Sequence, residues 1–298
     1  MWKPLLTASA GILLQALSGW WDVLSHTIQF QSGDPPLNPA HIGLYLGVVL
    51  VGASLIMGLF RGGGWRAPLS AGFATQVAAG GLNEVTHRLP ELEESILHFT
   101  AHAMFTLGLL SSSLTIFVAI CIHTLFSEKV GAELHLCHMM SGVALWLTAS
   151  GSILYIADTT PAATVLLGFT SATILGSVVY SSLRAYAGTL AWTMYTVSVY
   201  FFTVGYVGGH PYIPIGFITT LLADVTKRRT AGKHYIRLAM VALLAMTAHL
   251  AYPTYITRPL QLVGLGLGGL IGGVLLAYVG GRLASGSRYP AMSRSVKM

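Results

Sequence analysis

The chain consists mostly of apolar runs that are long enough to cross a lipid bilayer as helices. A transmembrane helix needs about 20 predominantly apolar residues, because the hydrocarbon core is about 30 Å thick. Runs of this kind recur along the 298 residues, with short polar segments between them. We predict helices at residues 5–24, 42–60, 68–88, 97–126, 139–157, 162–183, 185–206, 211–225, 236–252 and 259–283.

The charge content indicates that lipid is the solvent of this chain. Charged residues make up 9% of it and hydrophobic residues 54%, whereas soluble proteins carry about 25% charged residues. Most of the basic residues lie in or beside the short segments between apolar runs, so the net charge of +6 does not indicate nucleic-acid binding. The sequence predicts an all-α, polytopic bundle of about ten membrane helices in the lipid bilayer.

The distribution of Lys and Arg predicts the orientation of the helices. With about ten spans and a cytoplasmic N-terminus, fourteen of the sixteen basic residues fall on the cytoplasmic side, as the positive-inside rule requires. Arg88 and Arg258 are the two exceptions. Both termini are therefore expected in the cytoplasm. The segments expected on the outer side of the plasma membrane are 22–41, 83–102, 158–161, 207–211 and 252–258.

A first group of candidate metal ligands lies where the first predicted helix ends and the second begins. Asp22 and His26 are four residues apart, hence on one helical face, and His41 opens the next helix. Ionisable side chains are costly in a membrane and are found mainly where they pair, bind or react. Imidazole with carboxylate oxygen suits copper, iron, zinc or nickel, and the residue types alone do not choose among these metals.

A second group repeats this pattern at the outer ends of the third and fourth predicted helices. Asn83 and His87 are again four residues apart, and His98 and His102 lie in the first turns of the next helix. A single histidine near a membrane surface is usually only a hydrogen-bonded side chain, but its repetition on one side favours a ligand role. We predict that the two groups lie close together. We expect no ligand role for the histidines near the cytoplasmic side, His123, His135, His138 and His234.

Glycines in the last predicted helix indicate close helix packing. Gly264, Gly268 and Gly272 recur every four residues, which is typical of a small-residue contact surface between membrane helices. Gly264, Gly266 and Gly269 also match the spelling G-x-G-x-x-G. Because no predicted strand precedes them, we do not expect a dinucleotide site there.

The motifs of the first half resemble a known family. The segments that carry the resemblance are Trp21-Asp22-x3-His26 with Asn38-Pro39-Ala40-His41, and Gly81-Leu82-Asn83-Glu84-x2-His87 with His102-x-Met104-Phe105. They are similar to the C subunit of the copper membrane monooxygenases, the particulate methane and ammonia monooxygenases. The resemblance implies that copper is bound by Asp22, His26 and His41, and also by Asn83, His87 and His102. It implies that the second set is the catalytic, oxygen-activating site.

The second half resembles the A subunit of the same family. The matching segments are Gly205-Tyr206, Pro211-x2-Pro214 and Leu221-Leu222-x-Asp224-x4-Arg228-Arg229-x4-His234. The resemblance therefore implies a four-helix, C-subunit-like module at 1–134 and a six-helix, A-subunit-like module at 135–298. They would meet near a loop predicted at 127–138.

The implied function is that of a copper-dependent membrane monooxygenase, or of its core metal-bearing subunit. It would oxidise a small substrate such as ammonia, methane or a short hydrocarbon with dioxygen. Electrons would come from membrane quinol, and a separate B-type subunit would supply the soluble copper domains that this sequence lacks. The residues themselves leave two alternatives open. These are a non-enzymatic membrane protein for copper binding, transport or assembly, and a structural subunit.

Overall fold

The computed structural model describes residues 2–29, 39–58, 64–93, 95–126, 132–157, 160–181 and 259–286. These ranges are almost entirely α-helical and contain no strand, which confirms the predicted all-α class for this part of the chain. The predicted spans at 185–206, 211–225 and 236–252, and the A-subunit-like motif, lie outside the described residues. The helices are α1 (Trp2–Gln29), α2 (Pro39–Gly58), α3 (Arg66–Arg88), α4 (Pro90–Glu93), α5 (Ile96–Phe126), α6 (Ala132–Ala157), α7 (Pro161–Ser181) and α11 (Pro259–Gly286).

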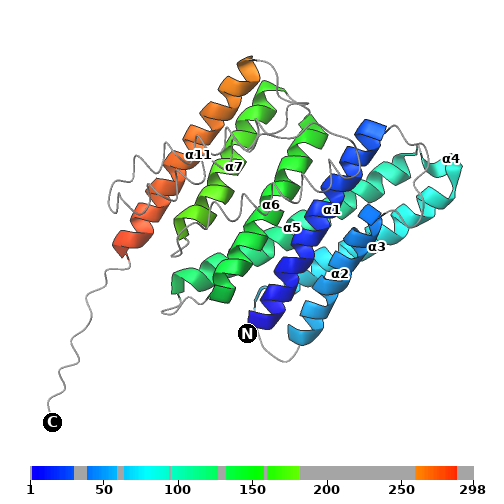
Figure 1. The fold of residues 1–298 in the computed structure, drawn as a ribbon, viewed down its shortest axis with the longest axis horizontal. Coiled ribbons are helices and arrows are strands. Elements are labelled where there is room, and N and C mark those ends of the chain that lie inside the picture. The colour runs from blue at the N-terminus through cyan, green and yellow to red at the C-terminus, as the bar shows by residue number, and fades with distance from the viewer. Residues whose placement is uncertain are drawn as a thin grey trace, which may run out of the picture.

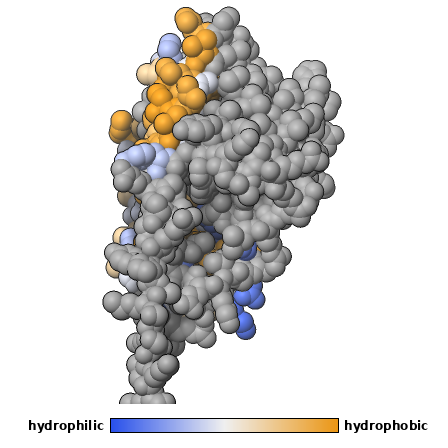
Figure 2. Space-filling view, turned by 90° about the vertical axis from the view of Figure 1, so that its left-hand side faces the viewer, coloured by the Kyte–Doolittle hydropathy of each residue, from blue (hydrophilic) through white to orange (hydrophobic). Residues whose placement is uncertain are grey.

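Three of the described helices are long and apolar enough to cross a membrane. They cover Pro39–Gly58 in α2, Ile96–His123 in α5 and Glu133–Ile153 in α6. The surface suits lipid, because exposed apolar side chains line the outer faces of α2 and α5. Figure 2 shows another such band on the side of the bundle that carries α11. These features are consistent with an integral membrane protein.

The helices pack as neighbouring pairs that run the length of the bundle (Figure 1). The pairs in closest contact are α1 with α2, α3 with α5, and α7 with α11. The long helix α6 joins them, because it packs against α1, α5 and α7. The short helix α4, which connects α3 to α5, lies at the end of the bundle opposite the N-terminus (Figure 1).

Glycine brings the first two helix pairs into backbone contact. A Cβ atom on Gly47 of α2 would lie 2.6 Å from the carbonyl oxygen of Gly11 of α1. A Cβ on Gly108 of α5 would lie 2.9 Å from the carbonyl oxygen of Gly72 of α3. Only residues without a side chain allow membrane helices to approach this closely.

The glycine stripe of α11 faces α7, as its spacing predicts. A Cβ on Gly268 would overlap the carbonyl oxygen of Val165, and one on Gly272 would lie 2.8 Å from that of Phe169. A Cβ on Gly264 would collide with the Thr164 hydroxyl. The predicted close packing at this stripe is therefore confirmed.

Helix α6 begins earlier than predicted. The loop predicted at 127–138 ends by Ala132, where α6 starts, so His135 and His138 are helical. Leu134 and Cys137 on this first stretch are buried against the bundle, which gives the helix a reason to continue toward its N-terminus. Glu133 lies in the first turn, where a negative charge is stabilised by the helix dipole.

Candidate metal site

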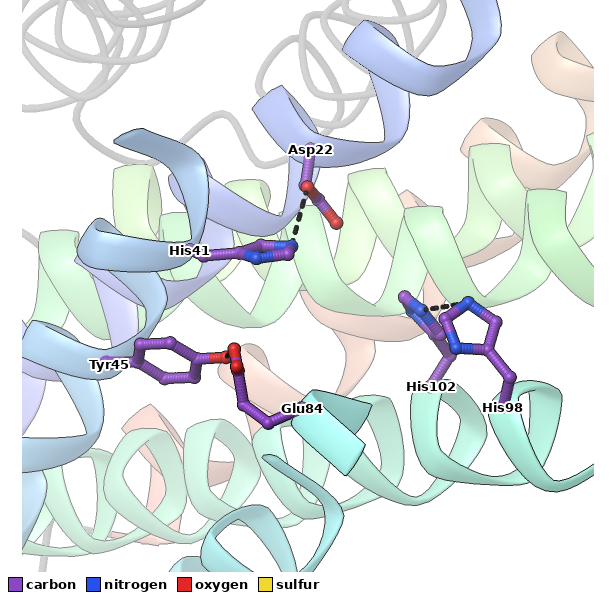
Figure 3. Close-up of polar contacts among 6 residues, drawn as sticks. All are labelled: Asp22, His41, Tyr45, Glu84, His98 and His102. Carbon is purple, nitrogen blue, oxygen red and sulfur yellow. Dashed lines mark hydrogen bonds and ion pairs between the residues drawn. The ribbon is translucent and has the colours of Figure 1, made fainter. Parts of the chain in front are cut away.

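Three histidines from α3 and α5 converge at the end of the bundle that carries α4. One ring nitrogen from each of His87, His98 and His102 can be chosen so that the three atoms lie within 4.8 Å of one another. The Nε2 atoms of His98 and His102 are 3.1 Å apart (Figure 3). The ring centroids of His87 and His98 are 4.6 Å apart. This cluster has the donor set and the spacing of a metal site.

Local sequence explains why the three rings meet. His98 and His102 are one helical turn apart, so they project from the same face of α5. Ser95 immediately precedes this helix, and its hydroxyl accepts a hydrogen bond from the backbone N–H of His98 over 3.4 Å. His87 lies in the last turn of α3. The short connection through α4 therefore brings it to the start of α5.

Asp22 and His41 form a buried pair between α1 and α2. His41 Nε2 lies 3.2 Å from Asp22 Oδ1, and both side chains are almost fully buried (Figure 3). The ring of His41 is also close to that of His87 of α3, with centroids 5.6 Å apart. The prediction that the two ligand groups lie near each other is confirmed for these residues. His26 lies in α1, one turn after Asp22, and its side chain is outside the described part of the structure.

Asn83 offers an oxygen one helical turn before His87. Its Oδ1 atom is shielded from solvent and has no hydrogen-bond partner among the described residues. Buried polar atoms are nearly always paired, so an orphaned amide oxygen beside a histidine cluster suits a ligand or a second-sphere partner. The residues predicted for the second site thus fit a metal ion by chemistry and by position.

A hydrogen bond between α2 and α3 borders the site. The hydroxyl of Tyr45 donates to the carboxylate of Glu84 (Figure 3). Arg88 Nη2 lies 3.8 Å from the other oxygen of Glu84. The ring of Tyr45 is also near that of His41, with centroids 6.2 Å apart. This contact links the two helical hairpins, α1–α2 and α3–α5, beside the candidate ligands.

Histidines near the predicted cytoplasmic side have a different environment. His138 is buried in α6, with its Nε2 3.7 Å from Cys121 Sγ and its ring against that of Phe117. His135 is buried one turn earlier. In the part of the chain that the structure describes, His87, His98 and His102 form the one metal-ligand cluster found.

The two hairpins also share a sequence pattern, in which each matching residue recurs 61 positions later, as Gly11 does at Gly72. The first helices contain Ser9-Ala10-Gly11-x3-Gln15-x3-Gly19-x2-Asp22-x3-His26 and Ser70-Ala71-Gly72-x3-Gln76-x3-Gly80-x2-Asn83-x3-His87. The second helices contain Ala40-His41-x5-Gly47 and Ala101-His102-x5-Gly108. The hairpins are therefore internal repeats, and the two ligand groups occupy equivalent positions in them.

The structure supports this equivalence in the packing of the hairpins. Gln15 is fully buried against Gly47, and Gln76 is fully buried against Gly108. Gln76 also donates a hydrogen bond to Ser112 over 2.9 Å. The repeat in the sequence therefore pairs each candidate ligand of the first group with one of the second.

The repeat also isolates what differs between the hairpins. Asp22 of the first corresponds to Asn83 of the second, so a carboxylate is replaced by an amide. Leu37 corresponds to His98, so the second hairpin has one imidazole more. His98 is the cluster residue that the predicted site omitted.

Comparisons with protein-family models, with curated proteins and with solved structures found no match for this chain.

Proposed function

We propose that the protein is a copper-dependent membrane monooxygenase, or the core metal-bearing subunit of one. The observation that carries the proposal is the convergence of His87, His98 and His102 within 4.8 Å, beside the buried pair of Asp22 and His41. Imidazole-rich sites suit copper, although other metals share this preference. The choice of copper rests on the resemblance of the motifs to the C subunit of the family.

The residues divide into two sets of ligands. Asn83, His87 and His102 would hold the catalytic copper, and Asp22, His26 and His41 would hold a second ion. Bound copper supplies the one-electron chemistry that activates dioxygen. The protein positions the ligands on helices rather than on loops, which fixes their geometry. The Asp22 carboxylate lies 3.2 Å from His41 Nε2, which makes it an electrostatic partner that orients the His41 ring.

Several further properties follow from the same proposal. The chain would have about ten spans, with both termini in the cytoplasm and the metal sites toward the outer side of the plasma membrane. Its modules would be residues 1–134 and 135–298. The substrate would be ammonia, methane or a short hydrocarbon, and quinol would be the electron donor. The functional assembly would be oligomeric and include a B-type subunit.

The alternative is a non-enzymatic membrane protein for copper binding, transport or assembly. A transport path needs polar groups through the depth of the membrane. The candidate ligands instead lie together at one end of the helices that carry them, where α1 and α3 end and α2 and α5 begin. This placement favours a fixed site.

The experiment that separates these functions is oxygen consumption by the purified protein in nanodiscs. Copper content is measured first, and oxygen uptake is then followed with quinol and with ammonia, methane or a short alkane. A soluble copper-domain partner is added in a parallel series. Substrate-dependent uptake that is lost in His87→Ala and kept in His123→Ala supports a monooxygenase. Bound copper without oxygen uptake on any substrate supports the copper-handling alternative.

A further inference from the structure

We propose that His98 is a third imidazole ligand of the ion bound by His87 and His102. We also propose that Thr86 orients the His98 ring so that the Nε2 atom of His98 faces that ion. This inference rests on the proposed function only in requiring that the cluster binds copper. It adds a ligand that the resemblance does not supply, and it gives a positioning role to a residue of α3.

The spacing of the two rings on α5 supports a shared ion. His98 Nε2 and His102 Nε2 face each other at 3.1 Å. Two imidazole nitrogens that each lie about 2.0–2.1 Å from one metal, with an angle of about 90–110° between the bonds, are about 2.8–3.4 Å apart. The observed distance falls inside this range, so the ion could sit between the two atoms with little movement of either ring.

Thr86 determines which nitrogen of His98 faces the ion. The hydroxyl of Thr86, which is fully buried, donates its one proton to the backbone carbonyl of Asn83 over 2.8 Å. The same oxygen lies 2.9 Å from His98 Nδ1, where it accepts a hydrogen bond if its own proton goes to that carbonyl. This arrangement favours the tautomer with the proton on Nδ1, which leaves the lone pair on Nε2. A hydrogen bond of this kind from the far ring nitrogen is the usual means of fixing the tautomer of a metal-bound histidine.

The internal repeat shows that the imidazole of His98 is specific to the second hairpin and is not part of the pattern that both hairpins share. The glycines, the buried glutamines and the ligand positions recur in both hairpins, but the counterpart of His98 is Leu37. Leucine is therefore the residue that the repeat has at this position of its sequence. Replacing His98 by leucine removes the imidazole without introducing a polar group, so the variant tests ligation rather than folding.

The test uses the full chain in nanodiscs, in a His26→Ala/His41→Ala background that removes the first ligand group. Pulsed electron paramagnetic resonance counts the imidazoles on bound Cu²⁺, and competition with a chelator gives the Cu⁺ affinity. We expect three imidazoles in the background protein and two after His98→Leu. Thr86→Val should weaken Cu⁺ binding roughly 10- to 100-fold. Thr86→Ser, which keeps the hydroxyl, should restore most of the affinity.

The matched control is Thr75→Val on the same helix, where the hydroxyl bonds the backbone oxygen of Ala71 over 2.9 Å. It should leave both the imidazole count and the affinity unchanged. Two imidazoles before His98→Leu, or equal affinities for Thr86→Val and Thr75→Val, would overturn the inference while leaving the proposed function standing. Copper bound by the wild type and lost from the background protein would also overturn it. A wild-type protein without copper would overturn both proposals.

Discussion

The imidazole rings of His41 and His87 come from different helical hairpins, and their centroids lie 5.6 Å apart. His41 is paired with Asp22 on the side of the first hairpin, and His87 stands next to His98 on the side of the second. The two hairpins therefore contribute to one polar region at this end of the bundle. Polar groups are costly in lipid unless they are paired. The stability of this region and its binding of a metal ion should therefore depend on each of these contacts.

Removing the negative charge of Asp22 should weaken copper binding by the first ligand group. Asp22→Asn places at this position the amide that Asn83 provides in the second hairpin, so the shape is kept and the charge is lost. Loss of even an outer partner of a metal ligand typically costs about 10- to 100-fold in metal affinity, so Asp22→Asn should cost at least roughly 10-fold. Chelator competition measures this loss. The control is Glu91→Gln on α4, an exposed acidic residue at the same end of the bundle. Equal affinities for the two variants would contradict the assignment of Asp22.

Adding a methyl group at Gly108 should destabilise the second hairpin. The new Cβ would lie 2.9 Å from the carbonyl oxygen of Gly72, so α3 and α5 must separate. Overpacking of this kind costs about 1–3 kcal/mol, and the melting temperature in detergent should fall. Copper binding by His87 and His102 should weaken as well, since these ligands come from the two separated helices.

Gly81→Ala is the matched control for that substitution. Gly81 lies in α3, the helix that Gly108 faces, and a Cβ atom on Gly81 would meet nothing within 4 Å. Alanine has the higher helix propensity, by about 1 kcal/mol, so this variant should be neutral or slightly stabilising. If Gly108→Ala melts at the same temperature as Gly81→Ala, then α3 and α5 do not pack as closely at Gly108 as described.

The proposed topology predicts which residues a reagent can reach from outside the cell. A cysteine placed at Glu91 in α4 should react with a membrane-impermeant thiol reagent in intact cells. A cysteine at Lys129, or at Met298, should react only after the membrane is permeabilised, because the basic segments are expected in the cytoplasm. Labelling of Met298→Cys from outside would rule out the arrangement with both termini inside.

Much of the described fold follows from the sequence by simple physics. Long apolar runs predict helices, and α2, α5 and α7 begin within a few residues of their predicted positions. The α11 glycines predicted a close contact because a stripe at four-residue spacing lies on one helical face. The start of α6 was missed because its first two turns contain Glu133, His135 and His138, whose polarity resembles that of a loop. The two histidines are buried, and their burial depends on neighbours that lie far away in the sequence.

The candidate site was only partly predictable from the sequence. The four-residue spacing predicted that Asp22 lies on the same helical face as His26, and Asn83 on the same face as His87. The alternation of spans predicted that both groups lie at the same end of the bundle. The role proposed for His98 needs Thr86, which lies twelve positions earlier on another helix. No helical periodicity relates two residues across a turn between helices. The internal repeat could have identified His98 as the position where the hairpins differ, but not what the extra imidazole contacts.

The copper content of the purified protein tests the central claim most directly. The wild type in nanodiscs should carry stoichiometric copper. His87→Ala and His102→Ala should each lose most of the copper held at the site of Asn83, His87 and His102. The reason is that a site of this kind needs all its imidazoles to hold the ion tightly. His123→Ala, at the other end of α5, should retain it. Helix content should stay the same in all variants, because packing rather than one imidazole stabilises the bundle. Stoichiometric copper retained by a His26→Ala/His87→Ala/His102→Ala variant would contradict the account.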